Sequence, residues 1–260
     1  MSEGRIDDNS CVRRDRLTMF KKRQRSSVGV IKETKLEDLS HSLIPLYNKA
    51  SCAFLIHNLF SSDECQQLIR LAEDQGFDRA TIEGPGGKQI MCGDIRSCGR
   101  CIIDDINIAD LIYERILKAI RGTQFEEKVI HKQKEDGESR IITTAVGLNE
   151  RLRFLKYTKG HFFAPHQDIP FTRGPEFGEE RAGETSQITV QIYLNEKFKG
   201  GSTRFVSGKR YYDVQPRRGS ALVFDHDLLH EGSIVTKGQK YSVRTDIMFK
   251  EVSKQIILSK

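Results

Sequence analysis

The sequence lacks several features that would place it in other classes of protein. It has no apolar run near the ~20 residues that a membrane helix needs, and its first ten residues, MSEGRIDDNS, lack the hydrophobic segment of a secretory signal. It has only six cysteines, which in a chain without a leader we interpret as thiols rather than as a disulfide framework. We therefore expect no membrane association and a cytoplasmic or nuclear location.

A wide excess of charge of one sign is also absent. The net charge is +6, but residues 11–25 hold seven basic residues and one acidic residue, so the rest of the chain sums to about zero. A dedicated nucleic-acid-binding domain is typically basic over a broad surface. Nucleic acid is therefore an unfavoured partner for the folded part. The run KKRQR at 21–25 is open to two interpretations, a nuclear-import patch or a solvated tail.

Nucleotide-binding glycine motifs are missing as well. The segment GPGGK at 84–88 has neither the spacing of a phosphate-binding P-loop nor the G-x-G-x-x-G of a dinucleotide site, so we expect a turn there. No internal repeat and no alternating βαβ rhythm occurs along the chain. These absences argue against repeat proteins and against doubly wound α/β folds.

What is present indicates one domain behind a polar arm. Hydrophobic residues make up 37% of the chain, which is sufficient for a sizeable core. Residues 1–38 are polar, charged and without periodicity. We therefore expect a disordered basic arm over 1–38 and a single folded domain over 39–260.

The order of predicted elements is helices first and strands later. Ser61 and Glu64 have the spacing of a capping box, followed by apolar residues at helical spacing, and a second helix is predicted over 107–121. Apolar and polar residues then alternate with a period of two over 188–194 and 240–247. This pattern favours an α+β fold in which helices support an antiparallel β-sandwich or barrel.

Side chains that bind metals occur in the second half of the chain. His166 and Asp168 are two residues apart, so on an extended strand both project from the same face. The segment DHDLLHEG adds His226 and His230. Two histidines and one carboxylate form the facial triad that holds non-haem Fe(II) and leaves three coordination positions open. Residues alone leave His226 and His230 as alternatives for the third ligand.

A cysteine pair forms a separate motif, CGRC at 98–101. A thioredoxin-like C-x-x-C should begin a helix directly after a strand, which the following IIDD does not suggest. A structural zinc would need a fourth ligand beyond Cys92, Cys98 and Cys101. We expect reduced thiols.

Four sequence blocks in order surround the metal-type residues: YTKGHFFAPHQD at 157–168, GGSTRF at 200–205, PRRGSALVF at 216–224 and HEGSIVTKGQKY at 230–241. Their arrangement resembles the catalytic domain of the prolyl 4-hydroxylase-like branch of the Fe(II)/2-oxoglutarate-dependent dioxygenases. The similarity covers about residues 50–250. The resemblance implies a double-stranded β-helix, a cupin-like jelly roll, with N-terminal supporting helices and a catalytic core at about 150–250.

The resemblance also implies the iron ligands. His166, Asp168 and His230 match them, and this leaves His226 at the rim of the site or in a position to orient a neighbouring group.

The family places a lysine or arginine about ten residues after the distal histidine to hold the far carboxylate of 2-oxoglutarate. Lys240 has this spacing, while Arg244 on the same strand face offers a bidentate guanidinium. Both stay candidates, with Lys240 preferred. Tyr157 matches the tyrosine that opens the first family motif, and Tyr193 is expected to line the cosubstrate pocket.

The implied function is an Fe(II)-, 2-oxoglutarate- and O2-dependent dioxygenase, supported by ascorbate, that hydroxylates a substrate C–H bond with formation of succinate and CO2. The nearest resemblance favours prolyl residues of a protein or peptide. The alternatives are a hydroxylase of a free amino acid or other small metabolite, and a non-catalytic cupin-type metabolite-binding or sensing protein. The oligomeric state is left open.

A long charged loop at 169–187 follows the metal pair. Its position suggests a lid in which Arg173, Glu176 and Arg181 recognise substrate, while a solvated loop is the equal alternative. Arg96 and Arg100 are further candidates for the pocket, although no pattern in the sequence places them there.

Overall fold

The structure is a computed structural model that describes residues 33–47, 52–83, 89–90, 92–136 and 139–256. The expected turn at 84–88 and residues 1–32 of the expected arm lie outside this part of the chain. Residues 35–38, which were expected to belong to the arm, instead form strand β1, because they pair in antiparallel register with β2. The folded part therefore begins before residue 39.

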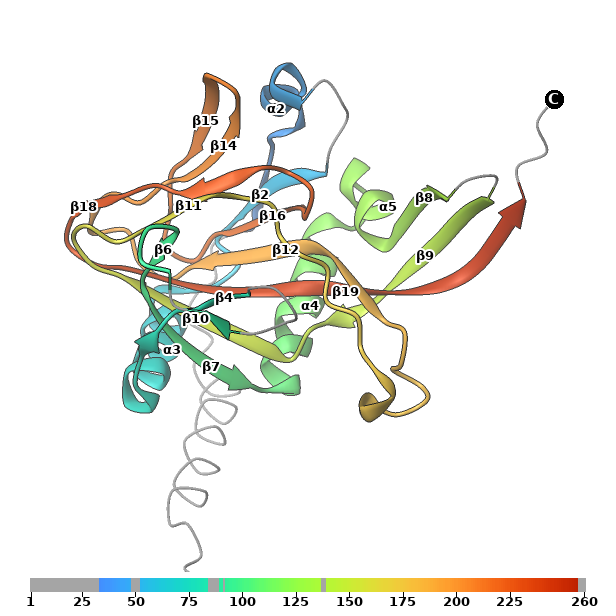
Figure 1. Ribbon diagram of the computed structural model, residues 1–260, viewed down its shortest axis with the longest axis horizontal. Coiled ribbons are helices and arrows are strands. Elements are labelled where there is room, and N and C mark those ends of the chain that lie inside the picture. The colour runs from blue at the N-terminus through green and yellow to red at the C-terminus, as the bar shows by residue number, and fades with distance from the viewer. Residues whose placement is uncertain (1–32, 48–51, 84–88, 91, 137–138, 257–260) are drawn as a thin grey trace, which may run out of the picture.

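A large antiparallel sheet forms the first layer. In spatial order its strands are β1 (Lys35–Asp38), β2 (Ala53–His57), β16 (Ala221–Asp225), β12 (Thr185–Tyr193), β19 (Lys240–Ile256), β10 (Arg151–Tyr157), β7 (Gly99–Asp104) and β3 (Asp78–Arg79). The long strand β19 also pairs with β9 (Ser139–Leu148), which pairs with β8 (His131–Asp136). These three strands project from the body at the right of Figure 1.

A smaller antiparallel sheet forms the second layer. Its order is β15 (Arg210–Val214), β14 (Thr203–Ser207), β17 (His230–Gly232), β11 (Phe162–His166) and β6 (Arg96–Ser97). Two short pairs complete the strands: β13 (Lys199–Gly200) with β18 (Val235–Lys237), and β4 (Ile82–Glu83) with β5 (Gln89–Ile90). Two antiparallel layers of this kind are the predicted double-stranded β-helix.

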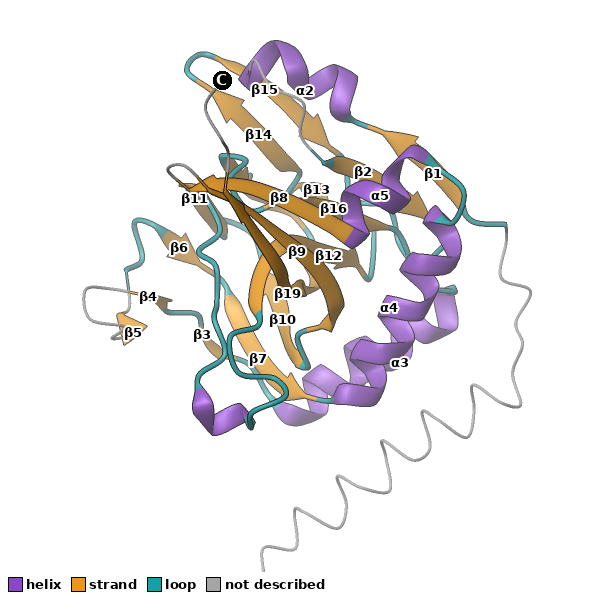
Figure 2. Cartoon of the chain, turned by 90° about the vertical axis from the view of Figure 1, so that its right-hand side faces the viewer, coloured by secondary structure: helices purple, strands orange, loops and turns teal. Residues whose placement is uncertain are grey.

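Three of the α-helices of the described residues lie outside the large sheet, and α2 packs against β14 and β15 of the smaller one. The four α-helices are α2 (Ser40–Tyr47), α3 (Ser62–Gln75), α4 (Ile106–Ile120) and α5 (Gln124–Ile130), with a 3-10 helix, η2 (Pro175–Phe177), in the long loop. Figure 2 shows α3, α4 and α5 together along one side of the sheet. The predicted capping box of α3 is confirmed: Glu64 N donates to Ser61 Oγ at 3.2 Å, and Ser61 N donates to Glu64 Oε2 at 2.8 Å.

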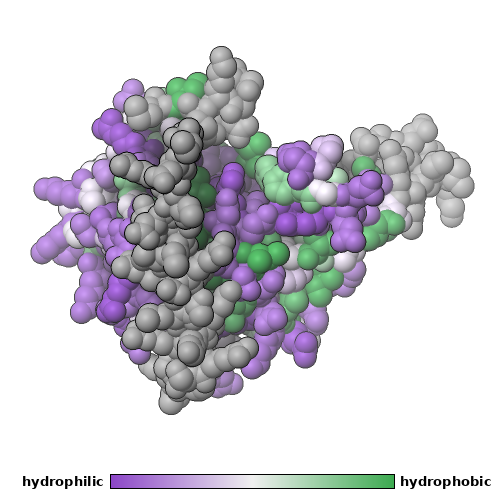
Figure 3. Space-filling view, turned by 90° about the horizontal axis from the view of Figure 1, so that it is seen from below, coloured by the Kyte–Doolittle hydropathy of each residue, from purple (hydrophilic) through white to green (hydrophobic). Residues whose placement is uncertain are grey.

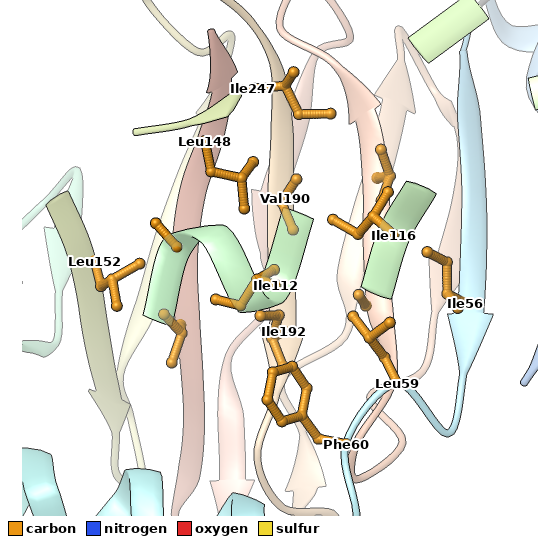
Figure 4. Packing of buried hydrophobic residues seen from close by; sticks show 14 of the residues in the cluster. Ile56, Leu59, Phe60, Ile112, Ile116, Leu148, Leu152, Val190, Ile192 and Ile247 are labelled. Atoms are coloured by element: carbon orange, nitrogen blue, oxygen red, sulfur yellow. The ribbon is translucent and has the colours of Figure 1, made fainter. Parts of the chain in front are cut away.

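The main core fills the space between these helices and the sheet. Figure 4 shows Ile112 and Ile116 of α4 among side chains from the neighbouring strands, including Val190, Ile192 and Ile247. The alternation of β12 explains this packing, because Ile188, Val190 and Ile192 share the face toward the helices. Thr189, Gln191 and Tyr193 consequently face the second sheet, where the site lies.

The outer surface is largely polar on the face drawn in Figure 3, with hydrophobic residues in small groups. Among the described residues, no helix is both long and apolar enough to cross a membrane.

Candidate iron and 2-oxoglutarate site

Three of the predicted site residues come together between the two sheets. His166 ends β11, Asp168 follows it by two residues, and His230 begins the neighbouring strand β17. His166 and His230 are directly opposite in the β11–β17 register. The Nε2 atom of His166 lies 3.6 Å from Asp168 Oδ1, and that of His230 lies 3.8 Å from Oδ2. One ligand atom of each residue lies within 4.8 Å of the other two.

Backbone carbonyl groups fix the orientation of both imidazole rings. The Nδ1 atom of His166 lies 2.9 Å from the oxygen of Ala164, and that of His230 lies 2.8 Å from the oxygen of Leu228. Each ring therefore donates through Nδ1–H and presents the lone pair of Nε2 to the carboxylate side. Burial lowers the pKa of His230 to about 4, so this imidazole is neutral near pH 7.

The Asp168 carboxylate is buried and held in its charged form. Thr189 Oγ1 donates to Oδ2 at 2.5 Å, and Arg244 Nη2 lies 3.0 Å from Oδ1. Burial alone would raise the pKa of Asp168, but the charge of Arg244 holds it well below its usual value. Two imidazoles and one carboxylate are a donor set that suits Fe(II). The residues present therefore fit this metal.

The triad opens into a cavity that reaches from the metal ligands to Lys240. Its lining residues are Arg96, Leu155, Tyr157, Phe163, His166, Asp168, Gln191, Thr203, His230, Glu231, Gly232, Lys240 and Arg244. Lys240 and Arg244 thus share the face that the strand periodicity predicts.

Lys240 is 2% exposed and has no carboxylate partner within the described part of the chain. Its Nζ donates to the carbonyl oxygen of Gly201 at 2.7 Å and lies 5.3 Å from the ring centre of Tyr157. Burial lowers the pKa of Lys240 to about 7. Gly201 has a φ of 67°, and a Cβ atom there would lie 3.3 Å from Lys240 Cδ, so glycine leaves room for the lysine stem. A buried cation without an anion is a site that an incoming carboxylate would complete.

Arg244 differs from Lys240 because two carboxylates already hold it. Its Nη2 lies 3.0 Å from Asp168 Oδ1 and 3.1 Å from Asp246 Oδ1. Asp246 also pairs with Arg153 Nη1 at 3.1 Å. Arg244 therefore connects the metal ligand Asp168 to a buried ion-pair network.

The two tyrosines occupy different depths. Tyr157 is buried and lines the cavity, as expected for the start of the first motif. Tyr193 is fully buried, but it is not among the lining residues, and its hydroxyl lies 2.7 Å from Thr203 Oγ1. Thr203 takes the lining position in front of it. The Tyr193 ring centre lies 5.5 Å from Lys240 Nζ, so a part for Tyr193 in the cosubstrate pocket stays a prediction.

His226 does not join the triad. It lies in the turn after β16, buried, with its Nε2 3.4 Å from Asp246 Oδ1. Its backbone carbonyl accepts a hydrogen bond from the Asp168 amide at 3.0 Å. These contacts place His226 beside the residues that support Asp168, which is the position expected for a histidine that orients a neighbouring group.

The loop after the metal pair, for which a lid and a solvated loop were equal alternatives, holds two of its arginines in ion pairs. Arg173 is 2% exposed and binds Glu184 Oε2 through Nε at 2.8 Å and Glu150 through both terminal nitrogens. Arg181 also binds Glu150, at 2.7 Å. Both guanidinium groups are therefore used to fix the loop. Glu176 is exposed on η2 and is not among the residues lining the site or its groove.

Arginines from three other strands line the outer part of the site. Arg96 on β6 and Arg100 on β7 line a groove that continues from the cavity, together with Arg153 on β10. Sequence reasoning named the first two without a place for them and missed Arg153 and Thr189. The alternation along β10 and β12 was the available signal, because it puts Arg153 and Thr189 on the cavity face.

The cysteines in the described part of the chain are free thiols. Cys98 and Cys101 are buried, and Cys92 is partly exposed. Arg96 Nε donates to Cys98 Sγ at 3.3 Å, so this thiol supports a residue that lines the site.

Comparisons with known proteins agree with the geometry. Residues 152–245 match the family model of the 2OG-Fe(II) oxygenase superfamily. The sequence is 27% identical to probable prolyl 4-hydroxylase 8 of Arabidopsis thaliana, over 73% of this chain and 66% of that protein. It is also 27% identical to a putative prolyl 4-hydroxylase of Acanthamoeba polyphaga mimivirus, over 75% of this chain and 72% of that protein.

Among solved structures, a prolyl-4-hydroxylase of Pseudomonas putida has a TM-score of 0.52 at 15% identity and covers 81% of this chain and 99% of that one. This likeness shows a shared fold. The match spans slightly less than two thirds of the Arabidopsis relative just named. The superfamily uses Fe(II), 2-oxoglutarate and O2, the set predicted from the sequence, and its iron-binding residue types are those of the observed triad. Residues 152–245 therefore match a 2OG-Fe(II) oxygenase domain, and the chain is similar to prolyl 4-hydroxylases over about three quarters of its length.

Proposed function

We propose that the protein hydroxylates prolyl residues of a peptide or protein, converting 2-oxoglutarate to succinate and CO2. The observation that carries this proposal is the triad His166–Asp168–His230 at one end of a cavity, with a buried lysine that has no carboxylate partner among the described residues at the other. A cosubstrate with a keto acid at one end and a carboxylate at the other fits both ends. The curated names of the relatives support prolyl residues as the target.

Lys240 is the group that we assign to the far carboxylate of 2-oxoglutarate. It has the spacing typical of the family, and no carboxylate of the described residues pairs with it. Arg244 already forms ion pairs with Asp168 and Asp246 at 3.0 and 3.1 Å, so an added anion would compete with both. Arg244 instead supports the metal ligand.

The protein's contribution is placement, charge and exclusion of water. His166, Asp168 and His230 would hold the Fe(II), which when bound supplies the redox chemistry that activates O2. Carbonyl oxygens fix the two rings, and Thr189 and Arg244 each engage one oxygen of Asp168. Lys240 holds the cosubstrate in one orientation, with Tyr157 in the cavity wall. The substrate reaches the triad from the groove that contains Phe163 and Phe171.

A peptide substrate is favoured over a free metabolite by the extent of the grooves. The groove beside the triad contains Ile169, Pro170 and Phe171. Pro170 also lines a second groove that runs along β9 and β19 past Thr143. An extended chain would follow such a continuous path, whereas a free amino acid would occupy only the part beside the iron.

The test is succinate formation by purified protein with Fe(II), ascorbate, O2, 2-oxoglutarate and a proline-rich peptide, with mass spectrometry of the peptide. We expect succinate and a peptide heavier by one oxygen atom, and loss of both in His166→Ala. His131→Ala is the matched control, because His131 is an exposed histidine of β8 that does not line the cavity, and it should keep full turnover. Wild-type protein that binds iron but forms no succinate with any candidate would favour a metabolite-binding protein instead.

A further inference from the structure

The groove outside the triad has an uneven distribution of charge. Its lining residues are Thr81, Ile95, Arg96, Arg100, Arg153, Phe163, His166, Gln167, Asp168, Ile169, Pro170, Phe171, Thr172, Arg244 and Asp246. Four arginines therefore face two aspartates, both of which are already engaged. The arginines come from the neighbouring strands β6 and β7 and from β10 and β19, which are distant from them in sequence.

Two of these four arginines form ion pairs with carboxylates, and the other two do not. Arg244 pairs with Asp168 and Asp246, and Arg153 pairs with Asp246 at 3.1 Å. Within the described part of the chain, neither Arg96 nor Arg100 has an ion-pair partner, although other arginines of the fold have theirs.

Arg100 is hydrogen-bonded only to Thr81 and has no carboxylate partner among the described residues. Its Nη2 donates to Thr81 Oγ1 at 2.7 Å, and its Nη1 lies 3.5 Å from the carbonyl oxygen of Thr81. Burial lowers the pKa of Arg100, and the charges of Arg96 and Arg153 lower it further. A half-buried guanidinium surrounded by like charges gains when an anion arrives.

Arg96 has less freedom than Arg100. Its guanidinium lies 4.5 Å from the ring centre of Phe163, and Phe163 stacks on His166 at a centroid distance of 3.6 Å. Its Nε is bonded to Cys98. Packing on Phe163 therefore restrains Arg96 beside the triad, while each terminal nitrogen of Arg100 keeps a second N–H for a bidentate contact.

We propose that this groove selects acidic substrates, with Arg100 binding a carboxylate of a peptide side chain next to the residue that is hydroxylated. The inference rests on the proposed function and deepens it, because it names the chemistry of the peptide. Arg100 is then a specificity-determining residue. Arg153 and Arg96 increase the attraction without forming the main contact.

The groove fits an acidic peptide better than a nucleic acid. A phosphate backbone carries an anion at every nucleotide and needs cations along its whole path. Here the arginines lie together, and the groove also presents exposed apolar side chains, with Ile95 40% exposed, Ile169 66% and Phe171 36%. Apolar contacts beside a group of arginines suit an extended peptide with an acidic side chain.

The test compares three blocked decapeptides that alternate proline with glutamate, glutamine or lysine. Binding is measured by fluorescence anisotropy to the protein with Fe(II) and 2-oxoglutarate without O2, so that it is separate from turnover. Hydroxylation is then measured by mass spectrometry in air. We expect the glutamate peptide to bind roughly tenfold more tightly than the glutamine peptide, the size of one charged hydrogen-bonding contact.

Variants of Arg100 assign this preference to the groove. Arg100→Gln should remove the preference for the glutamate peptide, and Arg100→Glu should make the lysine peptide bind more tightly than the glutamate peptide. Arg79→Gln, which alters an exposed arginine of β3 outside the groove, should leave it unchanged. Thermal melts of all three variants verify folding, and the reversal in Arg100→Glu is an outcome that a misfolded protein would not give.

The outcomes separate the two proposals. Arg100-dependent binding of the glutamate peptide without hydroxylation of any proline supports the acidic groove and contradicts prolyl hydroxylation. Equal binding and equal hydroxylation of all three peptides overturns the acidic groove and leaves the proposed function standing. A glutamate preference that survives in Arg100→Gln also overturns the acidic groove. So does tighter binding of a ten-nucleotide single strand of thymidines than of the glutamate peptide.

Discussion

Strands β12 and β19 have two faces of opposite chemistry. Toward the helices they present fully buried apolar side chains, namely Ile188, Val190, Ile192, Val243 and Ile247. Toward the second sheet the same strands present Thr189, Gln191, Lys240, Arg244 and Asp246. The period of two in their sequences produces both faces at once.

The difference separates stability from function. The apolar face gains roughly 25 cal/mol for each Å² removed from water, so it stabilises the fold. The polar face holds a buried lysine without a carboxylate and an arginine shared between two aspartates. Such groups cost desolvation energy that hydrophobic residues would avoid. Substitutions on the first face should therefore affect folding, and those on the second should affect activity.

The strongest test of this separation is Asp168→Asn. It removes the carboxylate from the triad while keeping the side-chain shape, so iron binding and succinate formation should both be lost. The melting temperature of the metal-free protein should change by only a few degrees, on the order expected for about 1 kcal/mol. Iron titration and thermal melts measure the two effects. A protein that no longer folds would show that Asp168 is structural as well as a ligand.

On the opposite face, Ile192→Ala should lower the free energy of unfolding by about 2–5 kcal/mol, because it leaves a cavity in a fully buried position. The kcat/KM per folded molecule should stay within about a factor of two. Urea denaturation and succinate assays check both values. Ile106→Ala is the matched control, because Ile106 of α4 is 53% exposed and should cost at most about 0.5 kcal/mol. Lost activity in folded Ile192→Ala would show that the two faces are coupled.

The same alternation explains why so much was predictable. The capping box at Ser61, the helix that proved to be Ile106–Ile120 and the paired faces of β12 are local patterns with direct physical causes. The three triad residues lie in short motifs whose spacing is informative. Such features depend on neighbours in sequence and so are visible in it.

The parts that were not predicted depend on distant partners. Strand β7, Gly99–Asp104, is short and polar, and it exists because β10 pairs with all six of its residues. The loop at 169–187 suggested a lid because of its length and its position after the metal pair, and the ion pairs of its arginines could not be predicted. Glu150, which fixes Arg173, precedes β10 and is more than 20 residues away. The groove likewise takes its arginines from four strands, so its local positive charge could not be predicted from the near-zero net charge of the folded domain.

On the polar face, Lys240→Met should raise the KM for 2-oxoglutarate about 100-fold, since it removes a buried charged contact worth up to about 3 kcal/mol. The melting temperature should not fall, because a cation without a carboxylate partner is replaced by an apolar side chain. Steady-state kinetics and thermal melts give both numbers. Lys237→Met, an exposed lysine on β18, is the control and should change neither. If Arg244→Met alone raises the KM, Arg244 holds the far carboxylate.

The smallest effect that we predict is a dependence of 2-oxoglutarate affinity on pH. Burial lowers the pKa of Lys240 to about 7, and only the protonated amine attracts a carboxylate. Below pH 7 the lysine is charged and the KM should be constant. Above pH 7 binding must first add a proton, so the KM should rise by up to about tenfold per pH unit. In Lys240→Arg the charge persists and the rise should vanish. A flat wild-type profile from pH 7 to about 9, above the usual pKa of histidine, would mean that Lys240 does not hold the cosubstrate.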